Sequence, residues 1–336
     1  MRLRKFIHCT LSGLLLAACT STTSSGTSET PLPPADGPVP ISFGSVQTRA
    51  IVGPDNRNLS PFAVWGWYTP TAPQTGPSTE VFNNTQVQPD GTYSGTRYWM
   101  DGMTYQFYAL HPHGLTATAT TGQISLSGFR TQSRGADTHD LMTAISNPIA
   151  YSTASSAPPV PLTFSHELAR IKFSAAAQGA EDVSLKNIII KGFYDVADYT
   201  KTFADSQWKG EWSFTGARSG QIEQDLLVVQ NTPATTGSTG QGSAESYDYV
   251  DLFDGDLMLI PQTITDDITI EATMVYPGQI MDEIYMKTTL NRVGITQWQK
   301  GMSYHYKVVL PAAMEQPVIT VSVEPWDTDD IFEDLN

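Results

Sequence analysis

Apolar and polar side chains alternate along several segments of this chain, a pattern typical of β-strands that bury one face. In the first of them Arg170, Lys172 and Ser174 are the polar positions between apolar neighbours. The segments that share this period of two are residues 169–175, 268–276, 304–310 and 319–323. Each is predicted to place one face on a core and the other in water.

Other segments are continuously apolar, namely residues 188–190, 226–229 and 257–260. Runs of this kind suit strands that are covered on both faces. Turn residues close several predicted strands, as at Asp90-Gly91 and Asp101-Gly102, and no long helical period is visible. We therefore expect an all-β fold made of two antiparallel β-sandwich domains in tandem.

Two stretches of linker-like composition interrupt the strand pattern. Residues 152–161 are rich in Ser, Ala and Pro, and they predict a boundary between an N-terminal domain, 39–158, and a C-terminal domain, 159–336. Residues 231–246 are rich in Thr, Gly and Ser, and because they lie between apolar runs we interpret them as a long hairpin loop.

The N-terminus has the form of a cleaved export signal, residues 1–18. Basic residues precede a mostly apolar stretch, 6–18, that is too short to span a bilayer, and the segment ends Leu16-Ala17-Ala18-Cys19. This ending resembles a lipobox, which predicts that the thiol of Cys19 carries a lipid. The alternative is an ordinary secretory signal that happens to end in cysteine.

Composition constrains the chain beyond the signal. Residues 19–38 are a predicted lipidated tether, because Ser, Thr, Pro and Gly dominate and almost nothing is apolar. After Cys19 the chain has no cysteine, which excludes disulfides and thiolate-ligated metals. Loss of the basic residues of the signal moves the formal net charge from −15 to −18, so we expect no nucleic-acid partner.

Catalytic and metal-binding patterns are weak. His166-Glu167-Leu168-Ala169-Arg170 begins like a zinc-protease helix, but Arg170 stands where the second histidine is needed. The remaining candidates are His111 and His113, Gly237, Gly240 and Gly242, and Asp251, Asp254 and Asp256. Turns and a polar loop account for them better than a metal or phosphate site does. We predict no catalytic residue, no metal site, no cofactor and no enzyme.

Several motifs, taken in order, resemble the fimbrillin family of Bacteroidales pilus lipoproteins. They are the lipobox, Pro40-Ile41-Ser42-Phe43, Thr48-Arg49-Ala50, residues 62–66, 105–112 and 162–171, Trp298 to Tyr306, and Val321 to Trp326. The resemblance implies two transthyretin-like β-sandwich domains, export to the outer membrane or a fimbrium, and other pilin subunits as partners. A host or bacterial surface receptor is a further expected partner, and the Cys19 lipid is the expected link to the membrane.

The resemblance also implies polymerisation by donor-strand exchange after an arginine-specific protease removes an N-terminal strand. Val39, Ile41 and Phe43 share a face of the candidate strand, and Arg49 occupies the position that matches the cleavage site. The alternative is a permanent first strand followed by an exposed arginine. The acidic tail, residues 326–336, is either a donor appendage or a solvated end.

A competing function is that of a surface lipoprotein that binds polysaccharide. Exposed aromatic rings stack on sugars, and the candidates are Trp65, Trp67, Tyr68, Tyr98 and Trp99. Trp65 and Trp67 also suit a sandwich core. Exposure of the indoles separates the two functions, because exposed indoles favour glycan binding and buried ones favour the pilus role.

Overall fold

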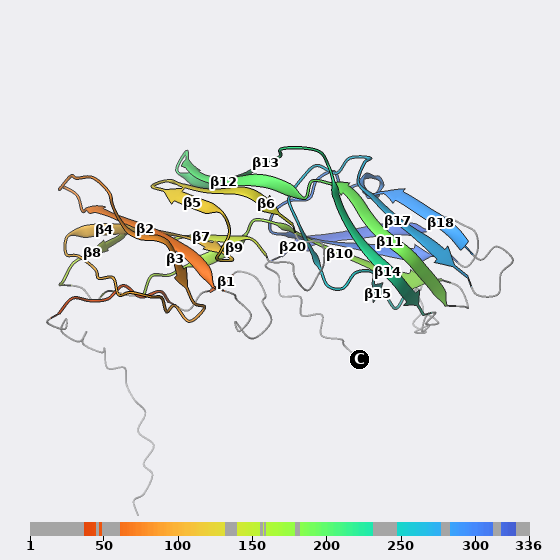
Figure 1. Cartoon of the computed structure of the whole chain (residues 1–336), viewed down its shortest axis with the longest axis horizontal. Helices are drawn as coiled ribbons and strands as arrows, with labels where there is room; N and C mark the ends of the chain where they lie inside the picture. The colour runs from red at the N-terminus through yellow and green to blue at the C-terminus, as the bar shows by residue number, and fades with distance from the viewer. Residues whose placement is uncertain are drawn as a thin grey trace, which may run out of the picture.

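A computed structural model describes the chain from residue 37 to residue 326 with gaps (Figure 1). The described residues are 37–44, 47–48, 61–131, 140–154, 157, 159–178, 182–230, 247–276, 283–311 and 317–326. The predicted signal, tether residues 19–36 with Cys19, and Arg49 lie outside them, as do the loop 231–246 and the tail after residue 326.

The described part of the chain is built of β-strands, with one short 3-10 helix, η3 (Leu290–Val293), and no α-helix. The N-terminal strands are β1 (Gln47–Thr48), β2 (Phe62–Pro70), β3 (Thr79–Val87), β4 (Met103–His111), β5 (Ala117–Thr120), β6 (Gln123–Arg130), β7 (Met142–Ile145), β8 (Ile149–Tyr151) and β9 (Thr163–His166). The later strands are β10 (Ala169–Ala177), β11 (Val183–Phe193), β12 (Val196–Ala204), β13 (Gln207–Ser213), β14 (Gly220–Val229), β15 (Val250–Asp251), β16 (Leu257–Leu259), β17 (Thr269–Val275), β18 (Glu283–Thr289), β19 (Met302–Leu310) and β20 (Val318–Pro325). The predicted all-β fold class is confirmed.

The strands form four sheets. Sheet A has the order β1-β9-β7-β4-β2-β3 with β8 beside β4, and sheet B has the order β13-β12-β6-β5. Sheet C runs β15-β10-β19-β20 with β16 beside β10, and sheet D runs β14-β11-β17-β18. Most pairs are antiparallel, whereas β1–β9 and β10–β19 are parallel. In Figure 1 sheet B lies along the upper side of the left half, over sheet A.

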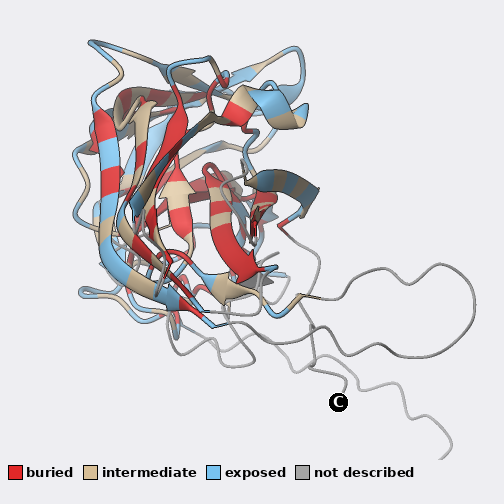
Figure 2. Ribbon diagram, turned by 90° about the vertical axis from the view of Figure 1, so that its right-hand side faces the viewer, coloured by how far each residue is buried: buried red, intermediate tan, exposed pale blue. Residues whose placement is uncertain are grey.

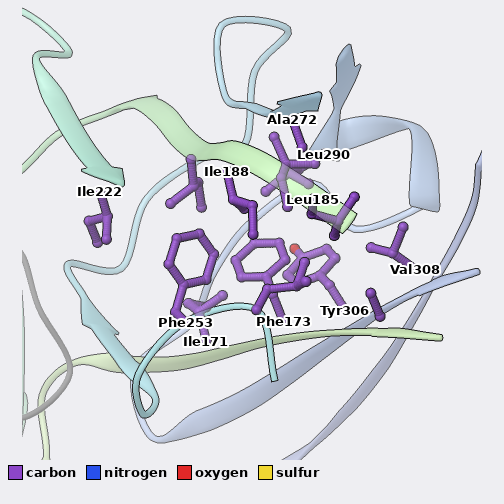
Figure 3. Close-up of a cluster of buried hydrophobic side chains, with 14 of the residues drawn as sticks. Ile171, Phe173, Leu185, Ile188, Ile222, Phe253, Ala272, Leu290, Tyr306 and Val308 are labelled. Carbon is purple, nitrogen blue, oxygen red and sulfur yellow. The ribbon is translucent and has the colours of Figure 1, made fainter. Parts of the chain in front are cut away.

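Three clusters of buried side chains hold these layers together. The largest fills the space between sheets C and D, where Phe173 stacks on Tyr306 with ring centroids 4.9 Å apart (Figure 3). The second, which we name the aromatic core, covers one face of sheet A and includes Phe82, Trp99 and Phe107. The third lies between sheets A and B. Burial of these apolar surfaces is the main stabilising contribution to the fold.

The predicted alternation is confirmed where strands face these cores. In β10 and β19 the apolar positions are buried and most of the polar positions between them are less so, and Figure 2 shows such banding along strands. In β17 only Thr273 follows the prediction, because Thr269 and Glu271 are buried as well. β20 is covered less well, since Ile319 and Val321 are half-buried and Val323 is 39% exposed. β20 pairs only with β19, so it lies at an edge of sheet C.

The prediction for residues 226–229 is wrong, because the strand is not covered on both faces. Leu226 is 56% exposed and Val228 47% exposed. β14 lies at the edge of sheet D, and within 226–229 only the alternate residues Leu227 and Val229 pack on the core, so the other face is open to water. The hairpin interpretation of the next segment is also wrong, since β14 and β15 belong to different sheets.

Strand pairing crosses the point at which we expected a domain boundary. β9 follows residue 158 in the sequence but pairs with β7 in sheet A. The hairpin of β12 and β13 also comes from the later half, yet β12 pairs with β6 in sheet B. The two halves thus share sheets, and the division into two tandem domains stays a prediction.

Candidate assembly site

The N-terminal segment, residues 39–48, lies between two neighbouring segments that are far apart in sequence. We name residues 39–48 the first strand; the structure describes 39–44 and 47–48 of it, and residues 47–48 form a regular strand, β1. On one side the Ile41 amide donates to the Arg97 carbonyl at 2.8 Å, and the Trp99 amide donates to the Val39 carbonyl at 2.9 Å. These contacts bind the start of the first strand to residues 97–99.

On its other side the first strand follows the segment that leads into β9. The Val160 amide donates to the Ser42 carbonyl at 2.7 Å, and the Gly44 amide donates to the Val160 carbonyl at 3.0 Å. β1 then continues parallel to β9, with Gln47 opposite Thr163. Residues 39–44 of the first strand therefore fill a slot between residues 97–99 and the segment before β9, bonded on both sides, and β1 continues at the edge of sheet A.

Side chains of the first strand fill the aromatic core beneath it. Ile41 is 2% exposed and Phe43 is 5% exposed, while Val39 is half-buried against the same core. The Phe43 ring packs edge-on against Phe82 at 5.4 Å and against Phe107 at 5.7 Å. The predicted common face of Val39, Ile41 and Phe43 thus faces the core.

The predicted turn at Asp90-Gly91 closes over this strand. Gly91 has a φ of +84°, and a Cβ at this position would lie only 2.4 Å from the Phe43 carbonyl oxygen. The hydroxyl of Tyr93 donates to the Ile41 carbonyl at 2.7 Å. A glycine is needed here both for the left-handed backbone and for the close approach to the first strand.

The aromatic residues considered for sugar binding are mostly internal. Trp65 is 2% exposed and Trp99 5% exposed, while Trp67 is half-buried against Tyr108. Tyr98 is exposed, but it is no indole. These residues do not form an exposed platform of indoles, so the observation that favours polysaccharide binding is missing.

A buried ionic cluster lies where sheets A, B and C meet. The carboxylate of Glu167, between β9 and β10, is fully buried. The ammonium of Lys201 in β12 donates to this carboxylate at 2.7 Å, and the ammonium of Lys300 donates to it at 3.0 Å. The hydroxyl of Thr143 in β7 also donates to it, at 2.7 Å. We name these four residues the junction cluster. The indole of Trp212 in β13 also donates to the Glu167 carbonyl, at 3.1 Å.

The junction cluster is suited to holding elements together and not to catalysis. Burial disfavours the charge on Glu167, but the ammonium groups of Lys201 and Lys300 outweigh burial and lower its pKa below the ordinary value. Gly210 of β13 packs over the cluster, and a Cβ there would lie 3.1 Å from a Glu167 carboxylate oxygen. Glu167 is thus ionised, paired and enclosed.

His166 has a structural environment, in line with our rejection of a zinc motif. Its ring bonds to the carboxylate of Asp140 and stacks on Trp326 at 3.8 Å. Burial raises the pKa of Asp140, although His166 opposes this effect. Among the described residues no group of three or more His, Cys, Asp or Glu side chains is arranged to bind a metal ion.

The other candidate site residues from the sequence lie apart from the junction cluster. Asp251 pairs with Lys172 at 3.2 Å and Asp256 with Arg170 at 2.5 Å, which agrees with a charged turn. His111 is the last residue of β4 and not part of the turn that we expected, whereas His113 lies in that turn. The glycines at 237, 240 and 242, Cys19 and Arg49 lie outside the described residues.

Sequence reasoning missed the lysines of the junction cluster. The sequence of β12 did indicate a buried lysine, because Tyr199 and Lys201 are two residues apart and so lie on the same face of the strand, which points inward. A lysine on the apolar face of a strand needs a buried acid partner. Nothing in the sequence indicated that this partner was Glu167.

Comparison with known proteins gives a consistent result. A family model described as fimbrillin-like matches residues 48–326. A fimbrial protein from Bacteroides vulgatus is similar in structure, with 16% identity and a TM-score of 0.53 over 85% of this chain and 99% of the other. A candidate cell adhesion protein from Bacteroides uniformis has 13% identity and a TM-score of 0.50 over 87% of this chain and 99% of the other.

Two further observations bear on the class of protein. A search of curated proteins returned no match. Within the described ranges, no helix has the length and apolar character needed to cross a bilayer. The fimbrillin-like family comprises structural and adhesion proteins and is not an enzyme family, as the sequence predicted. Because the family model covers most of the chain, the protein belongs to the fimbrillin-like family.

Proposed function

We propose that the protein is a subunit or accessory protein of a surface fimbria, assembled by exchange of its first strand for a strand of another subunit. The observation that carries this proposal is the first strand itself, which occupies a slot between residues 97–99 and 160–164. Its attachment consists of backbone hydrogen bonds and of Ile41 and Phe43 in the aromatic core. A strand from another chain with the same alternation can make the same contacts.

The position of Arg49 supports removal of this strand. Arg49 directly follows Thr48, the last residue of β1. Cleavage after Arg49 would separate the whole first strand, together with Cys19 and its lipid, from the rest of the chain. The slot would then offer the Val160 and Trp99 amides and the Arg97 carbonyl to a new strand.

The lipid at Cys19 has a different purpose in each form of the protein. If the chain is cut, the lipid serves only transport to the outer membrane and leaves with the first strand. If the chain is uncut, Cys19 is a permanent anchor and the protein acts at the base or tip of the fimbria. Its partners are other pilin subunits and, for an adhesive member, a surface receptor.

Mass spectrometry of material sheared from the cell surface tests this proposal. We expect a mature N-terminus at Ala50. Arg49→Ala should retain the first strand and abolish incorporation into filaments, whereas Arg57→Ala, a matched change eight residues later, should leave both unchanged. A chain that still begins at lipidated Cys19 with no filaments, or filaments built from the Arg49→Ala variant, would overturn the role of a polymerising subunit and leave only that of an anchored accessory protein.

A further inference from the structure

Trp99 carries a buried indole N–H that has no hydrogen-bond acceptor in the described part of the chain. The residue is 5% exposed and belongs to the aromatic core. A buried donor without an acceptor costs about 1–3 kcal/mol, so native proteins keep few of them. Such a group in the wall of a strand-binding slot calls for a functional explanation.

Permanent elements of the fold enclose much of the indole with aromatic rings. Tyr105 of β4 packs edge-on against it at 4.6 Å, and Tyr151 of β8 stacks on it at 5.5 Å. Phe107, also in β4, lies at 6.0 Å. The hydroxyl of Tyr105 already accepts the Met100 amide at 2.7 Å. These neighbours present ring surfaces and no acceptor that bonds the indole.

The first strand is the exchangeable neighbour of Trp99. Pro40 pairs with Tyr98 in antiparallel fashion, and the Trp99 amide donates to the Val39 carbonyl, so Val39 lies directly across from Trp99. Residues opposite each other in such a pair have Cβ atoms about 4.5–5.5 Å apart. The isopropyl group of Val39 brings no acceptor to this position.

We propose that Trp99 selects the incoming strand, favouring one whose residue at the Val39 position carries a hydrogen-bond acceptor, as Ser, Thr and Asn do. This inference rests on the proposed strand exchange. The preferred partner is a strand of another subunit with the order acceptor, any residue, aliphatic, any residue, aromatic, where the last two match Ile41 and Phe43. The resident first strand leaves the indole unpaired, and an incoming strand that bonds it gains about fivefold in affinity from about 1 kcal/mol.

The Trp99 backbone amide provides a direct readout, because it is bonded to Val39 only while the first strand is docked. In the full-length chain we expect Val39→Thr, which keeps the side-chain shape, to slow hydrogen exchange of this amide about fivefold. Ile41→Thr is the matched control, since it buries a hydroxyl opposite Arg97 and not opposite Trp99, and should accelerate exchange. In a Trp99→Phe background, Val39→Thr should also accelerate exchange, because the hydroxyl then has no indole donor.

If Val39→Thr accelerates hydrogen exchange of the Trp99 amide in the chain that keeps Trp99, the proposed hydrogen bond between the indole and residue 39 is overturned. A second experiment cuts the folded full-length chain after Arg49, so that the slot can open, and offers it two peptides of residues 37–48, with Val or Thr at position 39. Preferential capture of the Thr peptide, by about fivefold, is expected. Equal capture of the two peptides would overturn the selection of the incoming strand by Trp99, but not strand exchange itself. Capture of neither peptide, with the amide-exchange pattern as expected, would leave the indole pairing intact and overturn strand exchange.

Discussion

The first strand and the junction cluster are both buried and both join parts of the chain distant in sequence, but they are held by different forces. Residues 39–48 contain no ionisable side chain and are held by backbone bonds and apolar side chains. The junction cluster is held by a buried carboxylate between two ammonium groups. Under the proposed strand exchange, this difference predicts that the first strand is the exchangeable contact and the junction cluster the permanent one.

The physical reason lies in what each contact leaves behind when it opens. An apolar side chain that leaves a slot can be replaced by another of similar size, and the backbone groups can bond a new strand. An ion pair that opens inside the protein leaves a charge without a partner, which is far more costly. We therefore expect the junction cluster to keep sheets A, B and C together while the first strand is exchanged.

The largest expected effect comes from removing the charge at the centre of the junction cluster. Glu167→Gln leaves the buried ammonium of Lys201 without its carboxylate, and we expect the free energy of unfolding to fall by about 3–5 kcal/mol. Chemical denaturation measures this change. Lys300→Gln is the control, since the Lys300 side chain is 45% exposed and its pair with Glu167 should be worth about 1 kcal/mol or less.

Equal losses in the two variants would contradict the enclosed character of the junction cluster. A further expectation concerns the first strand. Because the junction-cluster side chains that bond Glu167, those of Thr143, Lys201 and Lys300, all lie outside residues 39–48, the amide of Trp99 should keep its protection relative to global unfolding in the Glu167→Gln variant. Loss of that protection at lower denaturant than global unfolding would show that the two regions are coupled.

A smaller and more local effect is expected at the turn that closes over the first strand. Gly91→Ala adds a methyl group 2.4 Å from the Phe43 carbonyl oxygen, in a left-handed backbone. Gly102→Ala is a matched control, because Gly102 has a φ of +71° and open space around its Cβ position. Left-handed strain alone costs about 1–2 kcal/mol, which we expect for both variants.

Only Gly91→Ala should also displace the first strand. We expect faster hydrogen exchange at the Val160 and Trp99 amides, which are bonded to that strand, and no such change in the Gly102→Ala variant. Similar exchange in both variants would mean that the turn does not control docking of the first strand.

The sequence predicted the fold class and the inward face of the first strand, and it did not predict how the sheets are assembled. Alternation of apolar and polar residues depends only on which face of a strand meets a core, so it predicted the strands β10, β17 and β19. Which strands become neighbours depends on contacts distant in sequence. For this reason the pairing of β12 with β6, and that of β9 with β7, could not be inferred from a linker-like composition near residue 158.

The same limit applies to the candidate sites. Ile41 and Phe43 were recognised from local alternation, because both lie in one short segment. Glu167, Lys201 and Lys300 come from three separate segments, and their meeting is a property of the fold. Apolar residues 226–229 misled the prediction because a strand with one face in water can carry apolar side chains on that face.

The smallest effect expected is a difference in pH dependence between the first strand and the paired carboxylates Glu167 and Glu271. Burial disfavours the charge on Glu271, but hydrogen bonds from Lys191, Tyr285 and Lys287 outweigh it and lower its pKa from 4.5 to about 2. The pKa of Glu167 is also lowered. A carboxylate with a lowered pKa stabilises the folded state above its unfolded pKa, and this contribution is lost as the pH falls towards the folded value.

We therefore expect the free energy of unfolding to decrease between about pH 5 and pH 2, as measured by urea denaturation at each pH. Asp140, whose pKa is raised by burial, has the opposite slope and reduces the total change. Glu271→Gln should flatten the profile by about 1 kcal/mol, because Lys191 and Lys287 reach solvent and screening weakens their pairs.

Val39→Ala should weaken docking of the first strand without altering the slope, since residues 39–48 carry no group that titrates. A change of slope in that variant would mean that the first strand and the charged clusters respond to pH together.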